Sequence, residues 1–174
     1  MSWPASKLRV KRLHDGQSGF TIVELMVVVA VMAVLAVIAI PSFNNAALSS
    51  KLNAIANNFV ASAQLARSEA IKRNMPVTLC ASDDGAACGG TWTQGWIILV
   101  GDDVLQAHGA VSTGFQLSGA VTTIQFQPSG VGATAATLTA CRYAPEVGSQ
   151  SRIITLSATG RPGVEKDPNA NACP

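Results

Sequence analysis

A single carboxylate stands inside the most apolar stretch of the chain. Between Phe20 and Ile40 the only polar side chains are those of Thr21 and Glu24. As a helix, these 21 residues would be about 30 Å long, close to the thickness of a bilayer core. A carboxylate in a membrane helix costs roughly 2.5–3.5 kcal/mol on insertion scales, so it is seldom present without a function. Glu24 is therefore a candidate functional residue.

Two more ordinary kinds of N-terminal segment also contain an apolar stretch: a secretory signal peptide and a single-pass membrane anchor. A secretory signal peptide has an apolar core of about 7–15 residues, which is shorter than this one, and a small-x-small cleavage site soon after it. Here Ala54-x-Ala56 lies too far downstream. A plain single-pass anchor explains the length of the stretch but not Gly19 or Glu24.

Four cysteines could form disulfides or bind a metal ion: Cys80, Cys88, Cys141 and Cys173. An even number of cysteines in an exported domain indicates two disulfides. The close C-x2-4-C spacing of a zinc site is absent. Three pairings are possible. We prefer Cys80 with Cys88, across a short turn, and Cys141 with Cys173, which would tie the C-terminal tail to a strand.

The residue types needed for catalysis do not form a recognisable set. Outside residues 1–19 the only histidine is His108, in a turn-like Gln-Ala-His-Gly segment with no carboxylate arrangement beside it. Asp83-Asp84-Gly85 and Asp102-Asp103 are typical of turns and do not match a calcium-binding loop. We therefore expect no enzyme activity, no cofactor and no metal site, and a solvent-exposed His108.

The positive charge is concentrated at the N-terminus. The whole chain has a formal net charge of +2, but residues 1–19 contain four basic residues and one acidic residue. The remainder has 8 basic and 9 acidic residues, a net charge of −1. A basic segment before an apolar one predicts a cytoplasmic N-terminus, with the rest of the chain outside the cytoplasm. Any binding of a polyanion must then be local.

One long helix is predicted to carry the apolar stretch into the rest of the chain. Pro41 should bend this helix, because proline removes a backbone hydrogen bond. Beyond it an apolar stripe continues at helical spacing to about Arg73: Leu48, Leu52, Ile55, Phe59, Ala63, Ala66 and Ala70. The opposite face is polar and includes Asn44, Asn45, Lys51, Asn58 and Ser62.

After Pro76 the pattern changes to short apolar runs separated by turns. These predict strands over 77–81, 96–100, 115–117, 122–127, 137–143 and 152–157. Strands that follow one long helix are typical of an α+β fold with an antiparallel sheet. We expect the inner face of the sheet to cover the apolar stripe.

The segment from Gly19 to Leu25 resembles the processing site of type IV prepilins. The resemblance implies that a prepilin peptidase cuts between Gly19 and Phe20 and methylates the new Phe20 amine. Glu24 then becomes the fifth residue, where the family carries an acid. The implied organisation is a leader over 1–19, a transmembrane and assembly helix over 20–40, and a pilin globular domain over 41–174.

Further motifs resemble the GspH/FimT group of minor pilins and pseudopilins. They are Leu65 to Asn74, Val77 to Cys80, Asp84-Gly85, Cys88, Gly95 to Ile98, Phe126-x-Pro128-x-Gly130, Cys141 and Thr159-Gly160-Arg161. The resemblance implies a pilin-like α+β fold and a minor pilin that primes a type IV pilus or lies near its tip. The alternative is a pseudopilin of a type II secretion system. The implied partners are a prepilin peptidase, other pilins and the inner membrane, with the globular domain in the periplasm and later at the cell surface.

DNA-binding members of this group carry Gly-Arg-x-Arg near the C-terminus, which gives a second alternative: capture of double-stranded DNA for natural transformation. This chain has Gly160-Arg161-Pro162-Gly163, so the second arginine is missing. The possible DNA-binding residues are Arg161 first, with Lys166, Arg152 or Arg142 as substitutes for the missing charge, and Lys72 and Arg73 next.

Overall fold

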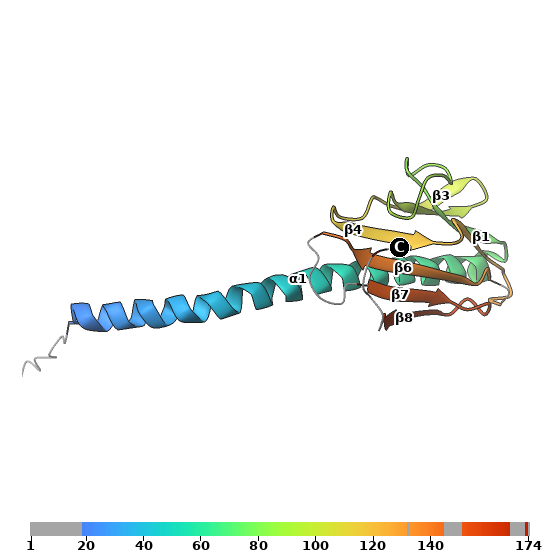
Figure 1. The fold of residues 1–174 in the computed structure, drawn as a ribbon. Helices are drawn as coiled ribbons and strands as arrows, with labels where there is room; N and C mark the ends of the chain where they lie inside the picture. The colour runs from blue at the N-terminus through green and yellow to red at the C-terminus, as the bar shows by residue number, and fades with distance from the viewer. Residues whose placement is uncertain (1–18, 132, 145–150, 168–172, 174) are drawn as a thin grey trace, which may run out of the picture. The chain divides into compact units, whose positions relative to one another are not determined.

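The computed structural model describes residues 19–131, 133–144, 151–167 and 173 (Figure 1). The leader predicted over residues 1–19 therefore lies, except for Gly19, outside the described residues. The chain divides into two units, Met1–Pro41 and Ser42–Pro174, which we describe separately.

A single helix, α1 (Ile22–Arg73), contributes to both units. Thr21 precedes the helix, and its Oγ1 accepts the Glu24 N–H at 3.2 Å and so caps the first turn. The helix is continuous through Pro41, so proline does not end it. The bend expected at Pro41 stays a prediction.

The end of α1 is closed by its own backbone. Asn74 has a φ of 54°, in the left-handed region. The Met75 N–H donates to the Ala70 carbonyl and the Asn74 N–H to the Ile71 carbonyl, both at 3.3 Å. This pair of hydrogen bonds satisfies carbonyls that a helix end leaves free. The chain can then turn directly into the first strand.

In the first unit, every side chain described from Phe20 to Ile40 is exposed. Among the described residues, α1 is the one helix long and apolar enough to cross a membrane, judged by length and composition.

In the second unit the apolar stripe of α1 is buried as predicted. Leu52, Ile55, Phe59 and four alanines (Ala56, Ala63, Ala66 and Ala70) face the core. Ser62 differs from the expectation, since it is only 3% exposed instead of lying on the polar face. Its Oγ accepts a hydrogen bond of 2.9 Å from Trp96 Nε1, which explains why a hydroxyl is tolerated there.

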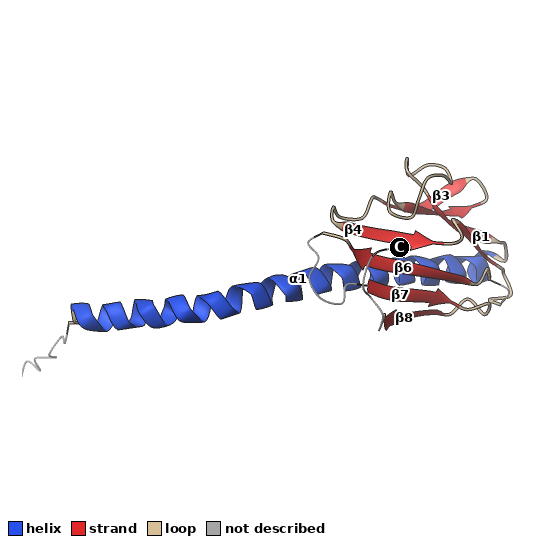
Figure 2. Ribbon diagram, in the orientation of Figure 1, coloured by secondary structure: helices blue, strands red, loops and turns tan. Residues whose placement is uncertain are grey.

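The strands form two four-stranded antiparallel sheets instead of the one sheet expected (Figure 2). The first has the order β3-β2-β1-β5, with bounds β1 (Val77–Ala81), β2 (Trp96–Val100), β3 (Asp103–His108) and β5 (Thr123–Phe126). The second has the order β4-β6-β7-β8, with bounds β4 (Phe115–Gly119), β6 (Ala136–Arg142), β7 (Ser151–Leu156) and β8 (Pro162–Lys166). The fold is nevertheless the predicted α+β arrangement.

Two strands, β3 and β8, were not predicted from the sequence. Both are edge strands with mostly exposed side chains, so neither shows an alternating apolar pattern. Strand β8 begins with Pro162, which is acceptable because the first residue of an edge strand need not donate a hydrogen bond. Arg161 directly precedes β8, so the backbone on its C-terminal side is held in the sheet.

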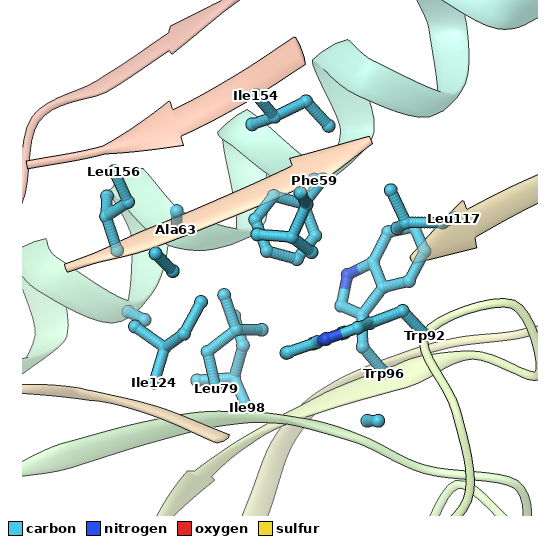
Figure 3. Close-up of a cluster of buried hydrophobic side chains, with 14 of the residues drawn as sticks. Phe59, Ala63, Leu79, Trp92, Trp96, Ile98, Leu117, Ile124, Ile154 and Leu156 are labelled. Carbon is cyan, nitrogen blue, oxygen red and sulfur yellow. The ribbon is translucent and has the colours of Figure 1, made fainter. Parts of the chain in front are cut away.

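Side chains from α1 and from both sheets meet in one core (Figure 3). Phe59 is at its centre, with its ring centroid 5.3 Å from that of Trp92 and 5.7 Å from that of Trp96, both in edge-to-face geometry. Leu79 and Ile98 come from the first sheet, and the second sheet contributes side chains such as Leu117 and Ile154.

The disulfides have the predicted pairing. Cys80 is joined to Cys88 and Cys141 to Cys173, and no described cysteine is free. Inside the first loop, Asp84 Oδ1 accepts the N–H groups of Ala86 and Ala87 and the Ser82 hydroxyl. These bonds, led by the one from Ala87, lower the pKa of Asp84. The Asp-Gly segment is thus a turn that the aspartate itself stabilises.

Phe59→Ala should lower the free energy of unfolding by about 3–5 kcal/mol, because it empties the space between two buried indoles. Urea unfolding of the chain in neutral detergent, followed by circular dichroism, measures the loss. Phe43→Ala is the matched control, since Phe43 is 75% exposed on the same helix and should change stability little. Equal losses for the two variants would contradict this account of the core.

Candidate functional sites at the N-terminal motif and an arginine-lined groove

The predicted cleavage point lies just outside the helix. Gly19 and Phe20 precede α1, and both are exposed, with Phe20 at 77%. A Cβ added at Gly19 would have no heavy atom within 4 Å. Exposed backbone outside regular structure is where proteolysis concentrates. The Gly19–Phe20 bond therefore meets the physical requirements for cleavage.

Glu24 occupies the first turn of α1, where the helix dipole favours a negative charge. Thr21 and Glu24 have the spacing of a capping box, and the Thr21 half of it is formed. Within the described part of the chain, the Glu24 carboxylate has no hydrogen bond or ion pair. It is an exposed acid on an otherwise apolar surface.

The second candidate site is a groove of about 450 Å³ between α1 and the turn from β7 to β8. Its lining residues are Gln64, Arg67, Ser68 and Ile71 from α1, with Gly160, Arg161 and Pro162 from the turn and β8. Arg67 is half-buried, and its Nε donates to the Gly130 carbonyl at 3.1 Å. Arg161 is exposed. The groove therefore brings together two arginines that lie 94 positions apart in the sequence.

Gly160 makes this approach possible in two ways. Its φ of 71° is in the left-handed region, which glycine adopts without strain. A Cβ at this position would lie 3.2 Å from Arg67 Cδ and 3.3 Å from Arg67 Nε, so the arginine would have to move.

A second hollow of about 590 Å³ also has Arg161 among its lining residues. Hydroxyl groups line much of it, from Thr137, Thr155, Ser157 and Thr159. Arg161 borders both hollows, and no acidic residue is among those that line either.

Arg142 and Arg152, the proposed substitutes for the missing arginine, are buried, at 2% and 9% exposure. Burial lowers the pKa of Arg142. Arg152 donates to Asn53 Oδ1 at 2.8 Å, to Ser49 Oγ at 3.2 Å and to the Ser151 carbonyl at 2.8 Å, which fastens β7 to α1. Neither guanidinium is exposed for contact with DNA. The suggestion that Arg142 or Arg152 replaces the missing arginine is therefore corrected.

Lys166 is exposed but lies at the far end of β8 from Arg161. Five residues of extended chain separate their Cα atoms by roughly 16 Å. Lys166 is therefore too far from Arg161 to stand in for the missing arginine, which is the role suggested for it from the sequence.

Lys72 and Arg73 are already paired. Their side chains contact Glu69 at 3.3 Å and 2.6 Å. The hydrogen bond from Arg73, followed by that from Lys72, lowers the pKa of Glu69. These cations are partly neutralised, unlike the pair at the groove.

His108 is not in a turn but is the last residue of β3. Its ring stacks on Trp96 with centroids 3.9 Å apart. Nδ1 donates to the Gly109 carbonyl at 2.9 Å, and Nε2 lies 3.3 Å from Asn58 Nδ2. The residue is half-buried and has a packing role. Among the described residues no three His, Cys, Asp or Glu side chains gather as a metal site would require.

Sequence reasoning missed Arg67 as a functional candidate. It was visible only as a member of the helix motif from Leu65 to Asn74. Only the fold shows that residue 67 lies beside two glycines with positive φ, Gly130 and Gly160.

Comparison with known proteins gives consistent results. The family model described as type II transport protein GspH matches residues 56–160, and the prokaryotic N-terminal methylation motif matches residues 15–40. No curated protein matches the sequence.

Similar solved structures include the type IV minor pilin FimU of Pseudomonas aeruginosa, with 21% identity and a TM-score of 0.54. The match covers 71% of this chain and 93% of that one. Another is the minor pseudopilin EpsH from the type 2 secretion system of Vibrio cholerae, with 16% identity, a TM-score of 0.51, and 67% and 97% of the two chains covered. At these identities the likeness establishes the fold. Because the GspH model spans more than half of the sequence and the methylation motif precedes it, the chain belongs to the GspH family of minor pilins and pseudopilins.

Proposed function

We propose that this protein is a minor pilin of a type IV pilus that helps to prime assembly or lies at or near the tip. The observation that carries the proposal is the exposed apolar surface from Ile22 to Ile40, which contains one carboxylate and begins two residues after Phe20. Such a surface is stable when lipid covers it before assembly and when other apolar helices cover it after assembly. Twitching motility, adhesion and DNA uptake are the activities that a subunit at this position serves.

In this proposal the helix spans the inner membrane before assembly, with the N-terminus in the cytoplasm and the globular domain in the periplasm. Pilus assembly then moves the helix from lipid into a bundle of pilin helices. Glu24 pairs there with the methylated amine of Phe20 on a neighbouring subunit. A buried charge pair is tolerated only when both partners arrive together, so the pair helps to set the axial register.

A pseudopilin of a type II secretion system is the alternative within the same family. The family model itself is described as a type II transport protein. Deletion of the gene distinguishes the two roles, because loss of pili supports the minor pilin and loss of protein secretion with intact pili supports the pseudopilin.

Processing should produce a mature N-terminus of N-methyl-Phe20. Gly19→Leu should block the cut almost completely, since a bulky side chain replaces the hydrogen before the scissile bond, and full-length precursor should remain in the membrane. Gln17→Leu, two residues earlier, is the control and should be cut normally. Intact-mass spectrometry reads both variants, and cleavage near Ala56 would refute the prepilin processing.

Glu24→Ala should leave processing largely intact but should remove most of the protein from sheared pili. The Phe20 amine would then be buried without its partner, at a cost of about 3–5 kcal/mol. Glu24→Gln keeps the size without the charge and should fail equally. Quantitative immunoblots of the pilus and membrane fractions give the ratio of assembled to membrane-bound protein. Normal assembly of either variant would exclude the role of Glu24 in axial register.

Capture of DNA is a second candidate function, favoured by a specific observation. Within the described part of the chain, Arg161 is an exposed arginine whose guanidinium makes no hydrogen bond or ion pair, at the border of two hollows lined by no acidic residue. Among the residues that the structure describes, no basic helix accompanies it that would enter a groove of DNA. Contacts should therefore be to phosphates and should ignore base sequence.

If the protein captures DNA, duplexes of unrelated sequence should bind equally at low salt and release steeply as salt rises. Arg161→Ala should weaken binding roughly tenfold or more, whereas Lys51→Ala, an exposed lysine elsewhere on α1, should have little effect. The chain should begin at Phe20, because the four basic residues of the leader would themselves bind DNA. Fluorescence anisotropy is the measurement, and equal effects of the two variants would place the DNA elsewhere.

A further inference from the structure

We propose that Arg67 and Arg161 together hold one phosphate of the nucleic-acid backbone in the groove between α1 and the β7–β8 turn. This rests on the proposed capture of DNA and assigns to Arg67 the part of the arginine that the Gly160-Arg161-Pro162-Gly163 segment lacks.

Arg67 is fixed in place before any ligand arrives. Its Nε donates to the Gly130 carbonyl at 3.1 Å. Its two terminal nitrogens make no hydrogen bond or ion pair among the described residues. Anchoring of Nε reduces the conformational entropy lost on binding, and the terminal nitrogens remain as donors for an anion.

The charges in the groove are not balanced by the protein. Its seven lining residues include two arginines and no acid. By contrast, Lys72 and Arg73, five and six residues further along the helix, share Glu69. Two neighbouring cations repel one another, and a bound anion reverses that cost. Guanidinium groups match the oxygens of phosphate with charge-assisted hydrogen bonds, which are about twice as strong as neutral ones.

The missing second arginine would fall at Gly163, where the strand leaves little room. A Cβ at Gly163 would lie 3.2 Å from Thr155 Oγ1 on the adjacent strand. The turn therefore supplies one arginine and the helix supplies the other. Lys166 cannot take this part, since the strand carries it away from the groove.

The test compares Arg67→Gln, Arg161→Gln and the double variant in the chain from Phe20 onward, in neutral detergent, by anisotropy with a short duplex over a series of salt concentrations. Lys51→Gln and Lys166→Gln are matched controls that remove one exposed charge elsewhere. Arg67→Lys tests whether charge alone suffices, and thermal unfolding checks that every variant is folded.

Each arginine variant should bind roughly tenfold or more weakly than either control. Since both arginines hold the same phosphate, the double variant should bind within about threefold of the weaker single variant, because the effects of contacting residues are not additive. Its slope of log K against log salt should fall by about 0.9, the value for one phosphate contact. Arg67→Lys should restore part of the affinity.

Binding by Arg67→Gln equal to that of the Lys51→Gln control would overturn the proposal. So would losses that multiply in the double variant together with a slope that falls by about 1.8, which would indicate two separate phosphates.

An experiment with inorganic phosphate tests the phosphate site independently of the capture of DNA. Phosphate should raise the unfolding temperature of the wild type more than chloride at equal ionic strength, and the double variant should lose this effect. A phosphate effect without DNA binding would retain the phosphate site and reject DNA as its ligand. The absence of both would reject both.

Discussion

The second unit depends on how closely α1 approaches its two sheets. Alanines at positions 56, 63, 66 and 70 remove bulk from the helix surface, and Phe59 then fills the space between Trp92 and Trp96. Two polar contacts prevent sliding within this interface. Ser62 accepts from the Trp96 indole, and Arg152 reaches two side chains of the helix. Apolar contact provides most of the stability, while these directional bonds select one register. The position of Arg67 beside Gly160 follows from that register.

Much of the fold could be predicted from local pattern. Strands β1 and β2 have the bounds expected, because apolar runs between Pro76, Gly95 and Gly101 leave few alternatives. The helix stripe and the disulfide pairing were also predicted. Strands β3 and β8 could not be, since edge strands bury too little to show a period of two. Their pairing depends on neighbours distant in the sequence.

The two candidate sites also differ in how far local sequence pattern could predict them. The processing motif is contiguous, so Gly19, Phe20 and Glu24 could be identified together. The groove lined by Arg67 and Arg161 depends on tertiary structure. Residue type alone could not separate exposed Arg161 from buried Arg142 and Arg152. Nor could it identify Arg67, which acquires its neighbours only when α1 packs beside the turn. Membership in the GspH family narrows the machine to a type IV pilus or a type II secretion system.

The aromatic centre of the core has a spectroscopic consequence. The sequence contains three tryptophans: Trp3, in the segment predicted to be a leader, and Trp92 and Trp96, which are both at most 2% exposed beside Phe59. In a chain that begins at Phe20, as the proposed processing would leave it, all indole emission arises from the contact between the helix and the sheets. The intrinsic fluorescence of the processed subunit is thus a label-free reporter of that contact, and a shift of the emission to the red registers separation of α1 from the sheets. Because Trp96 also stacks on His108, the imidazole is placed to quench one of the two emitters.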